Sequence, residues 1–108
     1  MDMQRRPTAV INVFTLKPGR QDEFFAVQEA AAREFAGSIP GLRGGRMHRS
    51  LDGKTAALIS LFDSQEDLQR WLDSARFAAH REKILGLVER ADAGRYEMVY
   101  ETGSLDLS

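Results

Sequence analysis

Cysteine is absent from this chain of 108 residues, which also has only two histidines and one tryptophan. A chain without cysteine forms no disulfide, has no thiolate nucleophile and cannot ligate zinc or an iron–sulfur cluster through sulfur. The sequence also lacks a Walker loop, the G-x-S-x-G and H-E-x-x-H motifs, and any flavin or nicotinamide fingerprint. These absences exclude cysteine-dependent chemistry and give no support to a resident nucleotide cofactor.

Neither an excess of one charge nor a long hydrophobic run is present. Lys and Arg total 15 against 16 Asp and Glu, so the net charge of −1 gives no electrostatic reason for a nucleic-acid partner. No stretch of about 18 apolar residues is long enough to cross a membrane, and residues 1–6 lack the apolar segment of a signal peptide. We therefore expect a cytoplasmic protein that binds neither nucleic acid nor membrane.

The residues that are present fit one ordinary domain. Hydrophobic residues make up 43% of the chain and charged residues 29%, and a chain of this length holds a single core. We expect one domain over residues 1–108, with its core over about residues 8–101.

Hydrophobic periodicity and turn residues predict six elements. In chain order these are a strand over 9–16, a helix over 20–36, strands over 42–50 and 55–62 joined by an Asp52-Gly53 hairpin turn, a helical region from Ser64 that includes Val88, and a strand over 95–101. The order β-α-β-β-α-β defines an α+β fold of the ferredoxin-like type with an antiparallel sheet. The apolar stripe of the first helix contains Phe24 and Phe35, with Gln28 among the polar positions between.

Alternate residues of a strand point to opposite faces of the sheet, and in this sequence both sets of alternate strand residues are apolar. Val10, Phe14 and Leu16 fall on one face of the first strand, whereas Ile11 and Val13 fall on the other. Because two helices can cover only one face of the sheet, the other face needs a partner, and a second copy of the chain is the available source. We therefore expect a homodimer.

Three side chains stand out as candidate site residues. Asn12 lies mid-strand, where asparagine is depleted and a buried amide needs hydrogen-bond partners. Trp71 and His80 are nine residues apart, so one continuous helix would turn about 900° between them and place them on opposite sides. They share a pocket only if the helix is interrupted between about residues 72 and 77, where Asp and Ser favour caps over helix interiors. His48, near the hairpin end, is expected at the surface.

The chain resembles the antibiotic-biosynthesis-monooxygenase superfamily of dimeric ferredoxin-like proteins over nearly all of residues 8–101. The carrying segments are Val10-Ile11-Asn12 with Pro18-Gly19, Ile39-Pro40-Gly41, and Leu61-Phe62-Asp63-Ser64-Gln65-Glu66. Within the superfamily it is most similar to the bacterial haem-degrading monooxygenases, whose strand asparagine, helix tryptophan and Ala-Ala-His histidine are matched by Asn12, Trp71 and Ala78-Ala79-His80.

This resemblance implies a dimeric α+β barrel that degrades haem, which is then both substrate and oxygen-activating cofactor. His80 would bind the haem iron through one ring nitrogen, with the other oriented by an acceptor. Asn12 and Trp71 would be the catalytic residues, one bonding to iron-bound oxygen and the other distorting the porphyrin. Electrons would come from an external donor, because no flavin or nicotinamide motif is present.

The sequence departs from the superfamily pattern at two positions, and two alternative functions stay open. Phe62 stands where the superfamily often has tryptophan, and Leu58 stands where its quinone-forming members have asparagine, which argues against that chemistry. The first alternative to haem degradation is a cofactor-independent oxygenase that acts on an aromatic or polyketide substrate. The second is a non-enzymatic dimer that keeps the fold for its pocket.

Overall fold

The structure, a computed structural model, describes residues 6–104. Its elements are β1 (Thr8–Leu16), α1 (Gln21–Phe35), β2 (Leu42–Arg49), β3 (Thr55–Phe62), α2 (Gln65–Leu72), α3 (Ala75–Leu85) and β4 (Val88–Tyr96). The four strands form one antiparallel sheet in the order β2-β3-β1-β4. The ferredoxin-like α+β fold expected from the sequence is therefore confirmed.

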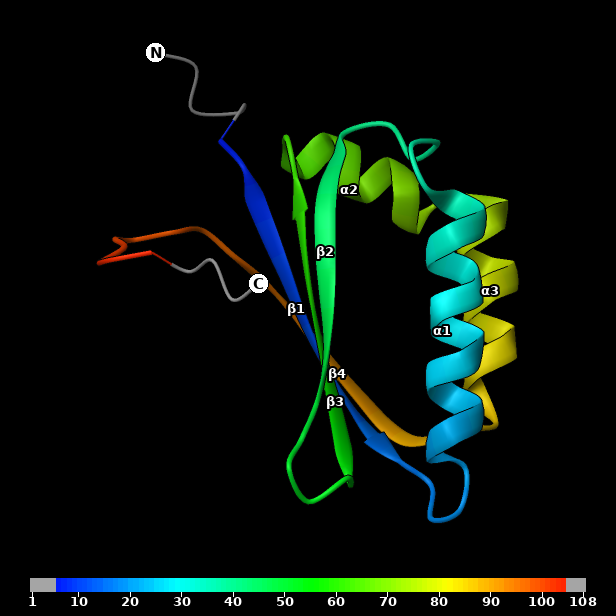
Figure 1. Cartoon of the computed structure of the whole chain (residues 1–108). Coiled ribbons are helices and arrows are strands. Elements are labelled where there is room, and N and C mark those ends of the chain that lie inside the picture. The colour runs from blue at the N-terminus through cyan, green and yellow to red at the C-terminus, as the bar shows by residue number, and fades with distance from the viewer. Residues whose placement is uncertain (1–5, 105–108) are drawn as a thin grey trace.

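The helices lie on one face of this sheet (Figure 1). In Figure 1, α1 and α3 lie side by side against that face, and α2 lies beside one end of the sheet. The core fills the space beneath them, where Phe14 of β1 contacts Phe24 of α1 with 5.1 Å between ring centroids. Ile84 of α3 and Leu87, which lies between α3 and β4, belong to the same buried cluster.

The helical region after β3 is interrupted, as the Trp71-to-His80 spacing required. α2 ends at Leu72 and α3 begins at Ala75. Ser74 is the N-cap of α3, because its Oγ accepts a hydrogen bond from the Phe77 backbone N–H at 3.1 Å. The same hydroxyl donates to the Trp71 carbonyl at 2.7 Å, so one side chain ends one helix and begins the next.

The last strand lies earlier in the chain than the sequence pattern predicted. β4 runs over Val88–Tyr96 rather than 95–101, and Val88 belongs to the strand and not to the preceding helix. The charged and small residues of this segment have low strand propensity, but pairing with β1 from Ala9↔Tyr96 to Leu16↔Val88 supplies its backbone partners. β4 lies at one edge of the sheet. Its charged residues are typical of edge strands, where they oppose pairing with further chains.

The face of the sheet opposite the helices carries exposed apolar side chains. Val13 is 38% exposed, Ile59 43% and Leu61 36%. No element of the described chain lies over these residues as α1 and α3 lie over the other face (Figure 1). This outer sheet face is therefore an apolar surface that the described residues leave uncovered.

Within residues 6–104, no helix combines the length and the hydropathy needed to span a membrane.

Candidate functional site

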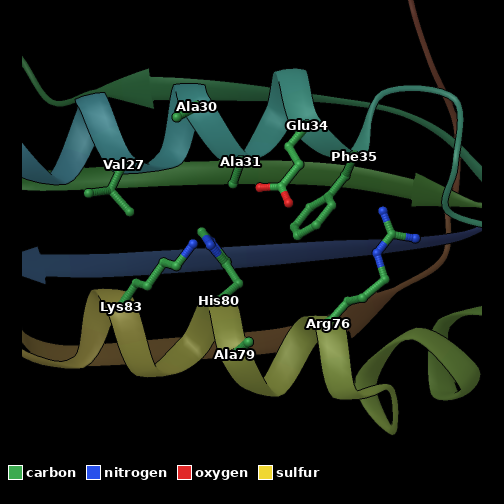
Figure 2. Close-up of a pocket in the computed structure, with 9 residues that line it drawn as sticks. All are labelled: Val27, Ala30, Ala31, Glu34, Phe35, Arg76, Ala79, His80 and Lys83. Carbon is green, nitrogen blue, oxygen red and sulfur yellow. The ribbon is translucent and has the colours of Figure 1, made fainter.

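A cavity of about 270 Å³ lies between α1 and α3. Figure 2 shows side chains from the two helices facing each other across it. α1 supplies mainly apolar and small side chains, with Phe35 at one end and Glu34 as its acidic member. α3 supplies the basic members, Arg76, His80 and Lys83, at spacings that put them on one side of the helix.

His80 is held in the wall of this cavity by a residue of α1. Its Nε2 lies 2.5 Å from Oε1 of Gln28, which is itself buried. Burial lowers the pKa of His80 below its ordinary value of 6.5, and the neighbouring Lys83 lowers it further, while Glu34 acts in the opposite direction. The imidazole is therefore neutral at neutral pH.

The hydrogen bond to Gln28 fixes which nitrogen of His80 carries the proton. An amide oxygen can only accept, so the neutral ring donates from Nε2 and keeps its lone pair on Nδ1. Nδ1 makes no hydrogen bond within the described chain, and it is not among the buried side-chain atoms that lack a partner. His80 therefore presents an accessible, unprotonated nitrogen.

Sequence reasoning missed Gln28. It was placed among the polar positions of its helix, but the structure buries it to 9% exposure. The signal was its spacing of four residues from Phe24, which puts both side chains on the same face of α1. A polar residue on an apolar stripe needs a buried partner, and His80 is that partner.

Trp71 lies in an aromatic cluster next to the cavity and is not part of its lining. Its ring packs edge-on against Phe35 at 5.3 Å and against Phe77 at 5.7 Å between centroids. Phe35 also contacts the His80 ring at 6.2 Å. With α2 and α3 separated by this break, Trp71 and His80 contact the same phenylalanine, Phe35.

Asn12 faces the helix side of the sheet, like Phe14 two residues later. It pairs with Leu58 of β3 and with Ala93 of β4. Its Oδ1 is buried and has no hydrogen-bond partner within the described residues. Asn12 does not line the cavity between α1 and α3, so it is a buried acceptor in the layer between sheet and helices.

His48, expected at the surface, lies on the outer sheet face and is half-buried there. It pairs with Ala57 across β2 and β3, with Nδ1 at 3.4 Å from the Ala57 carbonyl oxygen. Like Ile59, two residues beyond Ala57 on the same strand face, it belongs to the outer sheet face. It lies on the opposite side of the sheet from the cavity.

The three residues expected to bind and degrade haem do not converge on one cavity. His80 lines the cavity, Trp71 lies beyond Phe35, and Asn12 lies in the layer beneath. At about 270 Å³ the cavity is also smaller than the roughly 300–1,000 Å³ usual for drug-sized ligands. As placed here, the residues do not form a slot for haem.

The fold and cavity together define a class: an α+β protein with an antiparallel four-stranded sheet, helices on one face, and a cavity between α1 and α3. The family profile described as antibiotic biosynthesis monooxygenase matches residues 7–83. The chain therefore belongs to the antibiotic biosynthesis monooxygenase family.

Solved structures share this fold. Rv0793 from Mycobacterium tuberculosis is 21% identical with a TM-score of 0.77, covering 90% of this chain and 99% of its own. SnoaB from Streptomyces nogalater, described as a cofactor-independent oxygenase, is 22% identical with a TM-score of 0.76, covering 94% and 98%. PA3566 from Pseudomonas aeruginosa is 14% identical with a TM-score of 0.77, covering 92% and 100%. No curated protein sequence matches the chain significantly.

Proposed function

We propose that this protein is a monooxygenase that oxidises a compact hydroxylated aromatic substrate with O₂, using His80 as the proton acceptor. One observation carries the proposal: the free nitrogen of His80 at the cavity is an acceptor. A substrate hydroxyl, or an acidic C–H conjugated to one, is the group that such an acceptor recognises. Membership of a monooxygenase family and the likeness to SnoaB support the reaction class.

The proposed reaction balances without an added reductant. For an anthrone-like substrate, Nδ1 of His80 takes one proton from the ring CH₂, and the electron pair left on carbon is delocalised over the aromatic system. That pair forms a C–O bond to O₂, and the resulting peroxide anion takes the proton back from His80. Loss of the second C–H proton with cleavage of the O–O bond gives a ketone and water. The sum, R₂CH₂ + O₂ → R₂C=O + H₂O, draws all its electrons from the substrate.

The departure at Leu58 bears on this proposal. Quinone-forming relatives have asparagine there, but Leu58 lies directly opposite Asn12 in the β1–β3 register. An amide is therefore present at the same level of the sheet, on the neighbouring strand. Its Oδ1 is a buried acceptor without a partner in the described chain, in the layer beneath the cavity. Asn12 lies outside the cavity lining, so the proposed oxidation rests on His80, and the catalytic role expected for Asn12 belongs to the haem candidate.

Haem degradation is the second candidate function. It is favoured by the neutral His80, whose ring is oriented by Gln28 as a metal-binding imidazole would be. The separation of Trp71 and Asn12 from the cavity that His80 lines counts against it. The catalytic role of Trp71 and the haem-iron role of His80 belong to this candidate.

Oxygen consumption tests the two functions against each other. We expect the purified protein to consume O₂ with 1,8-dihydroxyanthrone, faster than the uncatalysed rate, in buffer free of hemin and reductant. His80→Gln should lower the rate about 10²- to 10⁴-fold, and His48→Gln, the matched change at the other histidine, should leave it unchanged. Stoichiometric hemin binding followed by bleaching with ascorbate, without anthrone oxidation, would instead establish haem degradation.

A further inference from the structure

A second polar group on the cavity wall is not used by the proposed oxidation. Arg76 lies on α3, four residues before His80, and its guanidinium carbon is 4.6 Å from the centroid of the Phe35 ring. Its Nη1 donates to the Ser38 carbonyl at 3.2 Å and its Nη2 donates to Ser38 Oγ at 2.7 Å. Figure 2 shows this guanidinium at the Phe35 end of the cavity.

These contacts hold the guanidinium without using all of its donors. A guanidinium has five N–H groups, and the two bonds to Ser38 use two of them. A ring-stacked, hydrogen-bonded arginine is already ordered, so little side-chain entropy is lost when it binds a ligand. Arg76 is therefore a pre-organised donor with three N–H groups left over.

The charge around the cavity favours an anion. No carboxylate within residues 6–104 forms an ion pair with Arg76, unlike the arginines that pair with Asp or Glu elsewhere in this part of the chain. Glu34 is the acidic member of the lining, against Arg76 and Lys83, and His80 is neutral. Arg76 also lies in the first turn of α3, which has no acidic residue and where the helix dipole disfavours a cation.

We propose that Arg76 binds a carboxylate carried by the substrate, so that the substrate is a hydroxylated aromatic acid. Four residues of helix separate Arg76 from His80, which is a rise of about 6 Å along the axis. The hydroxyl therefore meets His80 while the carboxylate meets the unused guanidinium edge at the other end of the same ring system. This inference rests on the proposed function for the identity of the hydroxyl end.

Binding of 4-hydroxybenzoate and of its methyl ester tests the inference without any oxidation. The two probes differ by one charge, and their affinities are measured by ligand-observed NMR at a pH where the acid is ionised. We expect the wild type to bind the acid about tenfold or more tightly than the ester, because a charge-assisted guanidinium–carboxylate pair is stronger than a neutral one. Arg76→Met should reduce this ratio to about one.

The controls separate the charge of Arg76 from its structural contact with Ser38. Arg81→Met removes an exposed α3 arginine outside the cavity lining and should leave the ratio unchanged. Ser38→Ala removes one acceptor of the Arg76 side chain but keeps its charge, so the acid should stay preferred. If Arg76→Met does not fold, Arg76→Lys decides, since it should lower the ratio without abolishing it.

Three results would overturn the inference: equal binding of acid and ester by the wild type, an unchanged preference in the Arg76 variants, or loss of the preference in Lys83→Met alone. The oxidation proposal fails separately. An acid preference that depends on Arg76, without any oxygen consumption, would leave the anion site standing and refute the oxidation. Oxidation of 1,8-dihydroxyanthrone without an acid preference would leave the oxidation standing and refute the anion site.

Discussion

At His80, burial and a nearby cation act on the imidazole in the same direction. Both favour the neutral ring, so the pKa of His80 lies below 6.5 in the folded chain. The unfolded chain then binds a proton at a higher pH than the folded chain does. Stability is therefore lost as pH falls from 6.5 through the folded pKa, and a proton acceptor at Nδ1 loses activity over the same interval.

The Gln28→Glu variant tests the contact between Gln28 and the His80 ring. A carboxylate at 28 would lie against Nε2 of His80 and favour the charged imidazole, so the pKa of His80 should rise. The rate–pH profile should move to higher pH with it. NMR titration of the imidazole ring protons measures the shift directly, and Glu34→Gln, which removes an acidic group already near His80, should move the pKa the opposite way. An unchanged pKa in Gln28→Glu would show that Gln28 does not contact the ring in solution.

The sequence alone identified some residues of the candidate site but not the contacts that orient others. Asn12 was identified because an amide in the middle of an apolar strand needs a partner, and the structure shows its oxygen buried without one. The contact between Gln28 and His80 joins residues 52 positions apart, so no local pattern contains it. The orientation of Arg76 depends in the same way on Ser38, in the loop after α1.

At the scale of elements, the break between α2 and α3 depends on Ser74. Its hydroxyl caps α3 and also bonds to the last turn of α2. Ser74→Ala should lower the free energy of unfolding by about 1 kcal/mol, the usual effect of losing a cap, as measured by urea denaturation. It should also broaden or shift the NMR signals of Trp71 and His80, which lie on either side of the break.

Ser64→Ala is the matched control, because Ser64 caps α2 through the Asp67 backbone N–H. It should destabilise the chain to a similar extent and leave the His80 signals in place. Equal perturbation of His80 by both variants would mean that the break does not position the site.

Most elements could be predicted because local chemistry defines them. The caps, the Asp52-Gly53 turn and the β-branched content of β1 and β3 are short-range signals, and those elements lie within a residue or two of the expected positions. β4 could not be placed, since its Glu, Arg, Asp and Ala residues pair only because β1 offers a free edge. A pocket at His80 was expected, but its position between α1 and α3 and its lining could not be predicted, because they depend on how far apart the two helices pack.

At the scale of the whole molecule, the exposed outer sheet face leads us to predict how two copies of the chain assemble. We propose that this face pairs with a second copy of the chain, because Val13, Ile59 and Leu61 remain exposed there. Leu61→Glu should convert a dimer to a monomer in sedimentation velocity runs at micromolar concentration. Leu85→Glu, the same change at an exposed leucine on α3 and away from this face, should leave the dimer intact. A wild type that sediments as a monomer would refute the paired-sheet assembly.

Oxygen-isotope incorporation is the measurement that tests the central claim most directly. The protein is supplied with ¹⁸O₂ and 1,8-dihydroxyanthrone, without hemin, flavin or reductant, and the product is analysed by mass spectrometry. The account predicts one labelled oxygen atom in the product ketone and a label in the water, at a rate that falls to near background in His80→Gln. A product that forms only when hemin and a reductant are added, or one that forms at the same rate in His80→Gln, would contradict it.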